Sequence, residues 1–178
     1  MTDAVDILAD RIDALESELR DLRDERAIRE LLALYGYLAD SKEIEKWLEL
    51  WTDDGVMDLS MGHSALEAEA FEHPQRWEGK DALRDFINDP TAYKKPGFYG
   101  RVMHLQGNNV QVRIDGDEAE VTAYSVVLHS AEGGPTTVLG AGSNRWTFRR
   151  EQGHWRIRSR IRRPNGDPEF GATLRVTP

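Results

Sequence analysis

The chain has 178 residues, enough for one domain with a hydrophobic core, and its 39% hydrophobic and 31% charged residues are typical of a soluble protein. Its formal net charge is -9, and an acidic chain repels phosphate backbones, so we expect no nucleic-acid partner. The absence of cysteine excludes disulfides, zinc–thiolate sites and thiol nucleophiles. No signal-peptide pattern and no apolar run of membrane-spanning length is visible, which favours a cytoplasmic protein without a membrane partner.

Residues 1–25 predict a helix with a narrow apolar stripe. The stripe residues recur at alternating spacings of three and four, the a/d pattern of a heptad repeat, and are Val5, Leu8, Ile12, Leu15, Leu19 and Leu22. Acidic and basic residues lie between them. Two interpretations stay open: an oligomer contact, or a helix that packs along its own domain.

A wider apolar face follows over residues 27–38 and predicts a more deeply buried helical segment that ends near Asp40 or Ser41. Its apolar members include Leu31, Leu34 and Tyr35. A short helix is expected over residues 44–50, with a stop and turn at 52–55 and a short strand over 56–59.

The middle of the chain is less regular. Residues 60–76 show weak periodicity and predict an insertion or loop, and residues 88–100 are also loop-like. Between them we expect a turn over 77–80 and a helix over 81–87.

The C-terminal half alternates apolar and polar residues between short turns, which is typical of an antiparallel meander. The expected strands cover 101–114, 118–130, 136–150 and 154–163, and an irregular tail occupies 164–178. In the last strand we expect four arginines at alternating positions to share one face. Helices followed by a meander predict an α+β fold, in which a curved sheet wraps over the helices as a cone over residues 26–163. Such a cup suits a small apolar molecule.

Five histidines are present, and they differ in what their context indicates. His63 and His73 flank acidic residues, but their spacing matches no metal-ligand pattern, so we expect no metal site. His129 ends a strand near the rim of the cup. His104 lies early in a strand, where it is either a buried imidazole bonded to a backbone carbonyl or a group that faces the pocket.

Asp40 ends an otherwise apolar helical segment. A carboxylate at a helix C-terminus opposes the helix dipole, so the position indicates either a solvated helix end or a functional acid. Tyr35 lies on the main apolar face of the same segment. If one face of the last strand lines the cup, at least one arginine points inward, where it would bind an oxyanion or a hydroxyl.

Three stretches together resemble SnoaL-like proteins of the nuclear-transport-factor-2-like superfamily. They are AIRELLALYGYLADSKEIEKWLELWTDDGVMD, HLQGNNVQVRIDGDEAEVTAYSVV and RWTFRREQGHWRIRSRIRR, and they cover most of residues 26–163. The resemblance is strongest to the lyase branch, which contains scytalone dehydratase, bile-acid dehydratase and lindane dehydrochlorinase. It implies a cystatin-like α+β barrel.

The resemblance also implies site residues. The functional Tyr and Asp of the bile-acid enzyme, five residues apart in a helix, fall on Tyr35 and Asp40. The strand histidine of these enzymes falls on His104. The pocket arginine of the dehydrochlorinase falls on Arg160, with Arg162 as the neighbouring alternative on the same face. This chain departs from the bile-acid enzyme in the following strand, where it lacks the acidic residue.

These assignments predict a lyase that needs no cofactor. An imidazole with a carboxylate on its other nitrogen can take a proton from carbon and return it, which suits a syn elimination. The expected substrate is a small apolar hydroxylated aromatic or polycyclic compound. Dehydration is the leading reaction, retro-aldol cleavage is related, and the alternatives are an isomerase of the ketosteroid-isomerase kind or a binding module without catalysis.

Further contacts to the substrate are predicted for five other side chains: Trp51, Asn108, Tyr124, His129 and Arg162. The lyase relatives also imply a homo-oligomer, with a trimer favoured over a dimer.

Overall fold

The computed structural model describes residues 4–59, 76–88 and 101–174. The elements, in chain order, are α1 (Ala4–Asp40), α2 (Ile44–Glu49), β1 (Trp51–Asp58), β2 (Arg76–Glu78), α3 (Gly79–Asn88), β3 (Val102–Asp115), β4 (Glu118–Ser130), β5 (Thr136–Glu151), β6 (His154–Pro164) and α4 (Phe170–Thr173). This is the α+β fold that the sequence predicts. The predicted insertion and loop fall mostly on residues outside the described ranges, as do His63 and His73.

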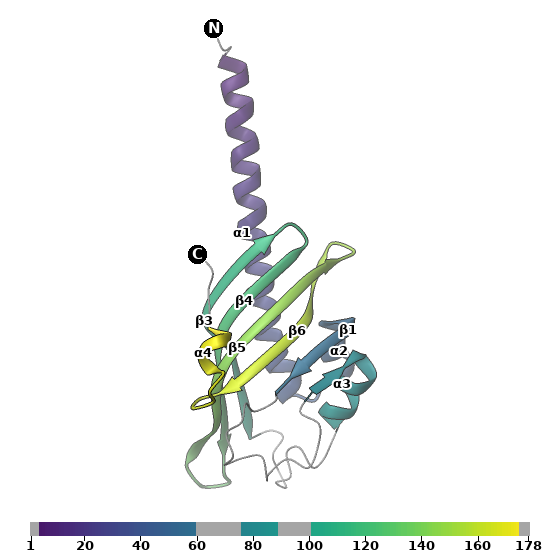
Figure 1. Cartoon of the computed structure of the whole chain (residues 1–178), viewed down its shortest axis with the longest axis vertical. Helices are drawn as coiled ribbons and strands as arrows, with labels where there is room; N and C mark the ends of the chain where they lie inside the picture. The colour runs from purple at the N-terminus through teal and green to yellow at the C-terminus, as the bar shows by residue number, and fades with distance from the viewer. Residues whose placement is uncertain (1–3, 60–75, 89–100, 175–178) are drawn as a thin grey trace.

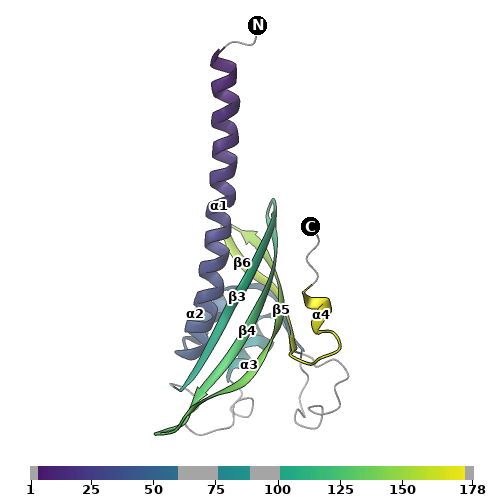
Figure 2. The same ribbon diagram turned by 90° about the vertical axis from the view of Figure 1, so that its left-hand side faces the viewer.

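The sheet has six strands in the order β2-β1-β6-β5-β4-β3. From β3 to β6 it is the expected antiparallel meander, but β1 joins β6 in parallel. The sheet is curved and unclosed, and Figures 1 and 2 show α1 along one side of it, next to β3, with α4 on the other side of β5. We call the side that α1 covers the inner face.

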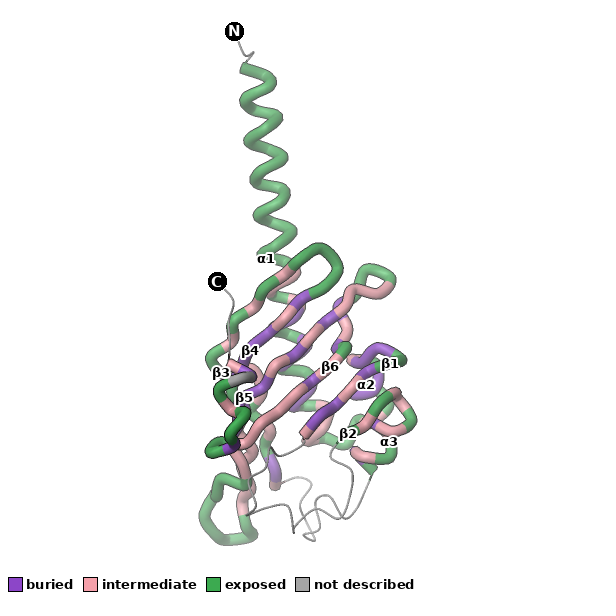
Figure 3. Tube along the Cα trace, viewed as in Figure 1, coloured by how far each residue is buried: buried purple, intermediate pink, exposed green. Residues whose placement is uncertain are grey.

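Helix α1 is one continuous helix of 37 residues, although the sequence shows two apolar patterns along it. Its first half projects beyond the sheet and is exposed throughout, as the green tube in Figure 3 shows. The stripe residues expose between 44% and 67% of their surface, so this half does not pack along its own domain. Among the described residues, no helix is both long and apolar enough to cross a membrane.

The second half of α1 supplies one wall of the core. Ile28, Leu32 and Tyr35 are almost completely buried against the inner face. Leu34, which the pattern places among the buried residues, is 46% exposed. The apolar residues of this helix occupy a wider face than the one that is buried against the sheet. The opposite wall comes mainly from aromatic and aliphatic side chains of the sheet and α2, which are Trp47, Trp51, Met57, Val121, Trp146, Phe148 and Ile157.

Two β-bulges change the expected pattern of strand residues. The predicted turn at 52–55 lies inside β1, where the pairing with β6 shifts between Trp51 and Val56, so these turn-forming residues make an irregularity in a strand that continues beyond them. In β6, Thr147 pairs with Ser159 but Phe148 pairs with Ile157, which leaves one extra residue in β6. Alternation is therefore reversed across Arg158, and the four arginines do not share one face.

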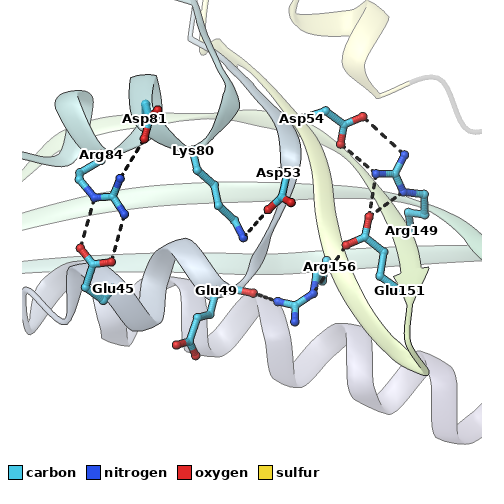
Figure 4. A network of polar contacts seen from close by, with 10 residues as sticks. All are labelled: Glu45, Glu49, Asp53, Asp54, Lys80, Asp81, Arg84, Arg149, Glu151 and Arg156. Carbon is cyan, nitrogen blue, oxygen red and sulfur yellow. Dashed lines mark hydrogen bonds and ion pairs between the residues drawn. The ribbon is translucent and has the colours of Figure 1, made fainter.

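Ion pairs on the surface connect α2, α3, β1 and the β5–β6 hairpin (Figure 4). Arg84 binds Glu45 at 3.1 Å, and Lys80 binds Asp53 at 2.8 Å. Because most of these side chains are solvent-exposed, each pair contributes little to stability by itself. Together they hold the helices of this end against the parallel pair of strands.

Candidate functional site

The carboxylate of Asp40 makes two hydrogen bonds to one residue, His104. Oδ2 accepts from the backbone N–H of His104 at 2.9 Å, and Oδ1 contacts Nδ1 of its ring. The two residues are 64 positions apart, at the C-terminal end of α1 and near the start of β3. Both side chains are mostly shielded from solvent, with 20% and 10% of their surface exposed.

The chain ends α1 sharply after Asp40. Lys42 adopts a left-handed conformation with φ of 58°, and Glu43 N–H donates to the carbonyl of Leu38 at 3.0 Å. This is the hydrogen-bonding pattern of a Schellman C-cap, here with lysine in the place that glycine usually takes. The cap leaves Asp40 in the last turn, from which its side chain reaches β3.

Gly36 lets α1 approach β3 closely at this point. A Cβ at Gly36 would lie 2.5 Å from the backbone carbonyl oxygen of His104, a distance that no real side chain tolerates. The glycine is therefore a packing requirement, because the helix and strand backbones touch one turn before Asp40. The same close approach sets the distance across which Asp40 reaches His104.

A second polar group surrounds the buried guanidinium of Arg160, which is 5% exposed. Nε donates to Asn144 Oδ1 at 2.9 Å, and Nη1 donates to Tyr35 Oη at 2.6 Å. Nη2 lies 3.4 Å from Gln106 Oε1. The guanidinium also lies over the rings of Tyr35 and Trp146, at 5.1 Å and 4.8 Å from their centroids.

All the described partners of Arg160 are uncharged. Within residues 4–59, 76–88 and 101–174, no carboxylate lies within ion-pair distance of it. A buried cation held by neutral acceptors retains a strong attraction for an anion or for an oxygen that gains negative charge. Burial raises the pKa of the Tyr35 hydroxyl, and the nearby Arg160 charge opposes that effect only in part. Tyr35 therefore keeps its proton at neutral pH.

The two polar groups share the inner face. Gln106 lies two residues after His104 in β3, so strand alternation places both side chains on one face. The β5–β6 pairing sets Arg160 opposite Trp146 and Arg162 opposite Asn144. Directly paired residues point to the same side of a sheet, so Arg162 also lies on the inner face, and Arg160 is the one that contacts Tyr35.

The other predicted contact residues have different surroundings. Trp51 is completely buried in an aromatic cluster with Tyr35 and Trp47, which makes it a core residue. Tyr124, for which a substrate contact is predicted, stacks on Phe170 of α4, on the face opposite Arg160. Its strand neighbours point inward, and alternation turns Tyr124 outward.

His129 and Asn108 are placed by the register of β3 and β4. His129 pairs with Val102, and His104 pairs with Val127, so the two histidines lie on the same face in neighbouring strands. The backbone of Asn108 pairs with Tyr124 beside a β-bulge, and its side chain lies outside the described part of the structure.

The sequence-based prediction missed Asn144 and Gln106. Asn144 is completely buried and also donates to Ser125 Oγ at 2.8 Å, so it connects Arg160 to β4. The sequence feature that could have indicated Asn144 is that a polar residue alternates with Trp146 and Phe148 on a face that is otherwise apolar. Gln106 Nε2 is a buried donor without a described acceptor. The sequence feature that could have indicated Gln106 is its position two residues after His104, on the same face of the strand.

No metal site is visible in the ranges that the structure describes, because they contain no group of three or more His, Asp or Glu side chains in a metal-binding arrangement. His63 and His73, at which no metal site is expected, lie outside these ranges. The described residues include a histidine ring held by a carboxylate, at His104, and a group of hydrogen-bond donors formed by Tyr35, Gln106 and Arg160.

Solved structures of this architecture are known as NTF2-like proteins with a cystatin-like fold. One such protein from Novosphingobium aromaticivorans is 29% identical, with a TM-score of 0.75 and 99% of each chain covered. A candidate scytalone dehydratase from the same organism is 19% identical over 82% of this chain and 86% of its own, with a TM-score of 0.62. The β subunit of a candidate aromatic-ring-hydroxylating dioxygenase, also from that organism, is 23% identical over 81% and 90%, with a TM-score of 0.62.

The fold thus defines the class as NTF2-like. The sequence matches the SnoaL-like domain over residues 20–161, most of its length, and the chain belongs to the SnoaL-like family. No curated relative matches the sequence.

Proposed function

We propose that this protein is a lyase that needs no cofactor and acts on a hydroxylated aromatic or polycyclic small molecule. Dehydration is the leading reaction, and retro-aldol cleavage is its close relative. The observation that supports the proposal best is the double contact of Asp40 with the backbone N–H and the ring Nδ1 of His104.

That contact determines what His104 can do. A carboxylate that accepts from Nδ1 favours the tautomer with its proton on Nδ1 and its lone pair on Nε2. The backbone hydrogen bond holds the carboxylate in place, so the ring has a defined orientation. The carboxylate also stabilises the imidazolium that forms when Nε2 accepts a proton.

In a dehydration, Nε2 of His104 removes a proton from the carbon next to a carbonyl. The electron pair of that C–H bond becomes the new C=C bond, and the neighbouring C–O bond breaks. The imidazolium then gives its proton to the departing hydroxyl, which leaves as water. In a retro-aldol reaction the same base takes the hydroxyl proton, a C–C bond breaks, and the proton is returned to the carbon of the enol product.

Arg160, Tyr35 and Gln106 supply donors for an oxygen that gains negative charge. As the C–H bond breaks, charge moves onto the substrate carbonyl oxygen. A guanidinium whose described partners are all uncharged attracts that oxygen more strongly than it attracts a neutral carbonyl, so the interaction is strongest in the transition state. Gln106 Nε2 is a further buried donor beside it.

An aryl β-hydroxy ketone is a suitable probe, because each reaction gives a different product. Dehydration gives a conjugated enone with strong near-ultraviolet absorption. Retro-aldol cleavage gives an aryl aldehyde and a ketone. A β,γ-unsaturated steroid ketone tests the isomerase alternative in the same assay format, since its conjugated product also absorbs.

Substitution of the pair then tests the assignment. We expect His104→Ala to lower kcat by roughly 10²–10⁴-fold, the usual contribution of general acid–base catalysis, and Asp40→Asn to lower it as well. His154→Ala, at an exposed hairpin position, is the matched control and should retain wild-type turnover. Wild-type turnover in both His104→Ala and Asp40→Asn would exclude the pair as the catalytic base. Tight binding of the probes by the wild type without any product would favour a binding module.

A further inference from the structure

The projecting half of α1 carries a continuous apolar stripe that its own domain does not cover. We call this stripe the seam, and its six residues are Val5, Leu8, Ile12, Leu15, Leu19 and Leu22. The spacing along the seam alternates between three and four residues, as in a heptad repeat. A helix of this length with an exposed apolar face gains little stability in water without tertiary packing. The seam therefore needs a partner surface.

The seam lies on the side of α1 that faces away from the domain. At roughly 100° per residue, its six positions cluster on one side of the helix, whereas Ile28, Leu31, Leu32 and Tyr35, the residues buried in the body, cluster roughly 180° away. A partner helix on the seam would therefore meet no part of the domain. Figures 1 and 2 show that the projecting half lies clear of the sheet in both views.

The identities of the seam residues select the geometry of the contact. Val5, Ile12 and Leu19 occupy the a positions, and leucine occupies all three d positions. β-branched residues at a with leucine at d favour two parallel strands over three. We propose that the seam binds the seam of a second copy of this chain, as a parallel two-stranded coiled coil.

The charges beside the seam agree with a parallel arrangement. In a parallel pair, each g residue faces the e residue five positions later in the other chain. Arg11 then faces Glu16 of the second copy, and Glu18 faces Arg23 of the second copy, so every charged pair is attractive. An antiparallel pair that overlaps the whole seam would match only Arg11 with Glu18. The parallel form has twice as many favourable pairs.

The seam ends where the helix meets the domain. The next a and d positions are Arg26 and Arg29, which form ion pairs with Glu30 and Glu25 of their own helix. The coiled coil therefore spans the projecting half and stops at the body. The two domains would lie at the same end of the pair, on opposite outer sides.

The mass of the full-length protein in solution, measured by light scattering after size-exclusion chromatography, tests the contact. Leu15→Glu places a charge in the centre of the seam and should halve the wild-type mass. Ser17→Glu adds the same charge on the opposite side of the same helix and should leave the mass unchanged. An unchanged mass for Leu15→Glu, or a threefold reduction, would overturn the proposal.

The absence of cysteine in the native chain allows a direct test of direction. In the parallel pair, Leu8 of each chain lies against Leu8 of the other, so Leu8→Cys should form a disulfide-linked dimer on air oxidation. In the antiparallel pair the two positions would be roughly 16 Å apart along the axis, too far for a disulfide. Asp10→Cys, on the outer side, is the control and should stay monomeric under denaturing, non-reducing electrophoresis. Absence of the Leu8→Cys dimer would overturn the parallel arrangement.

Discussion

Tyr35 is the residue at which the aromatic core and the candidate site meet. Its ring contacts Trp47, Trp51 and Trp146, with centroid distances between 5.2 and 6.1 Å. Its hydroxyl accepts from Arg160 and lies 3.8 Å from the sulfur of Met57. The side chain is thus held on all sides, and its hydroxyl is positioned by packing.

The raised pKa of Tyr35 predicts a specific loss of stability at high pH. A tyrosine in an unfolded chain loses its proton near pH 10, whereas burial keeps the Tyr35 proton bound to a higher pH in the folded protein. Its contribution to stability is therefore complete below about pH 10 and falls as the pH rises towards the folded pKa. In Tyr35→Phe, the melting temperature should therefore fall less steeply above about pH 10 than it does in the wild type.

Tyr37→Phe is the control for that measurement, because Tyr37 lies in the same helix and is 70% exposed. It should leave the alkaline curve unchanged. Identical alkaline curves for Tyr35→Phe and the wild type would contradict the prediction. If the proposed function is correct, Tyr35→Phe should also lower kcat, since the hydroxyl is one donor beside Arg160.

At the residue scale the sequence indicated individual positions but could not show which of them meet. Asp40 was unusual as an acid at the end of an apolar helix, and His104 as a histidine in an apolar strand. Their contact depends on the approach of α1 to β3, which no local pattern encodes. Asn144 and Gln106 could not be predicted because single polar residues in strands are common, and only the position of Arg160 gives them a partner.

The crossing of α1 and β3 is the element-scale feature on which the candidate site depends. Gly36 lies where the helix backbone touches the strand, and a methyl group there would overlap the carbonyl of His104. The methyl group would overlap a backbone atom of His104, so no side-chain rotation can relieve the overlap. The helix and the strand would have to separate.

Gly36→Ala should therefore destabilise the protein by about 1–3 kcal/mol, the usual cost of overpacking, although alanine favours helix more than glycine does. The separation should also weaken the two Asp40–His104 hydrogen bonds and lower turnover. Urea unfolding measures the first effect. Gly171→Ala, in α4 with nothing near the new methyl group, is the control and should be neutral or slightly stabilising. Greater stability of Gly36→Ala than of the wild type would show that helix and strand can adjust.

The four strands of the meander were predictable to within about one residue, because alternation and turn residues mark their ends. The prediction was wrong for β1, which begins five residues before the expected strand over 56–59, and for β2, which lies where a turn over 77–80 was expected. The bulges were not predictable, since one extra residue in a strand changes no composition. The bulge at Arg158 separates Arg156 and Arg158 from Arg160, and the register of β4 turns Tyr124 outward. The heptad pattern and the wider apolar face predict two helical segments. They form one helix because no breaker lies between Asp24 and Ala27.

At the scale of the whole molecule, a cluster at the edge of the body anchors the long helix. Arg150 of β5 donates to both oxygens of Asp24, at 2.6 and 2.8 Å, and Trp155 Nε1 donates to Oδ1 at 3.0 Å. Arg150 also lies 4.3 Å from the centre of the Trp155 ring. Asp24 is the point at which α1 leaves the domain, so this cluster fixes the direction of the projecting half.

These hydrogen bonds, above all the one from Arg150, hold the pKa of Asp24 below its ordinary value. A depressed pKa contributes stability above the unfolded value of about 3.9, and that contribution is lost as the pH falls through the folded value. Asp24→Asn should cost about 1.5–3 kcal/mol at pH 7, as for hydrogen bonds to charged groups. The difference from the wild type should shrink below about pH 4.

Asp21→Asn, one turn earlier on the exposed part of α1, is the control and should have little effect at either pH. Thermal unfolding at several pH values measures both variants. A constant difference between Asp24→Asn and the wild type from pH 7 to pH 3 would exclude ionisation of Asp24 as the source of the stabilisation.

The position of β6 in the sheet also determines the order in which the molecule can be completed during synthesis. β6 is the last strand to be made, yet it lies between β1 and β5. The hairpins β3–β4 and β4–β5 join neighbours in the sequence and can form while the ribosome is still adding residues. β1 and β2 have no place in the sheet until β6 arrives, and Arg160 arrives with it. A chain released before residue 154 would contain Asp40 and His104 but would lack β6, the strand that joins the two halves of the sheet. We therefore expect chains that end before this residue to be degraded and to have no partial activity.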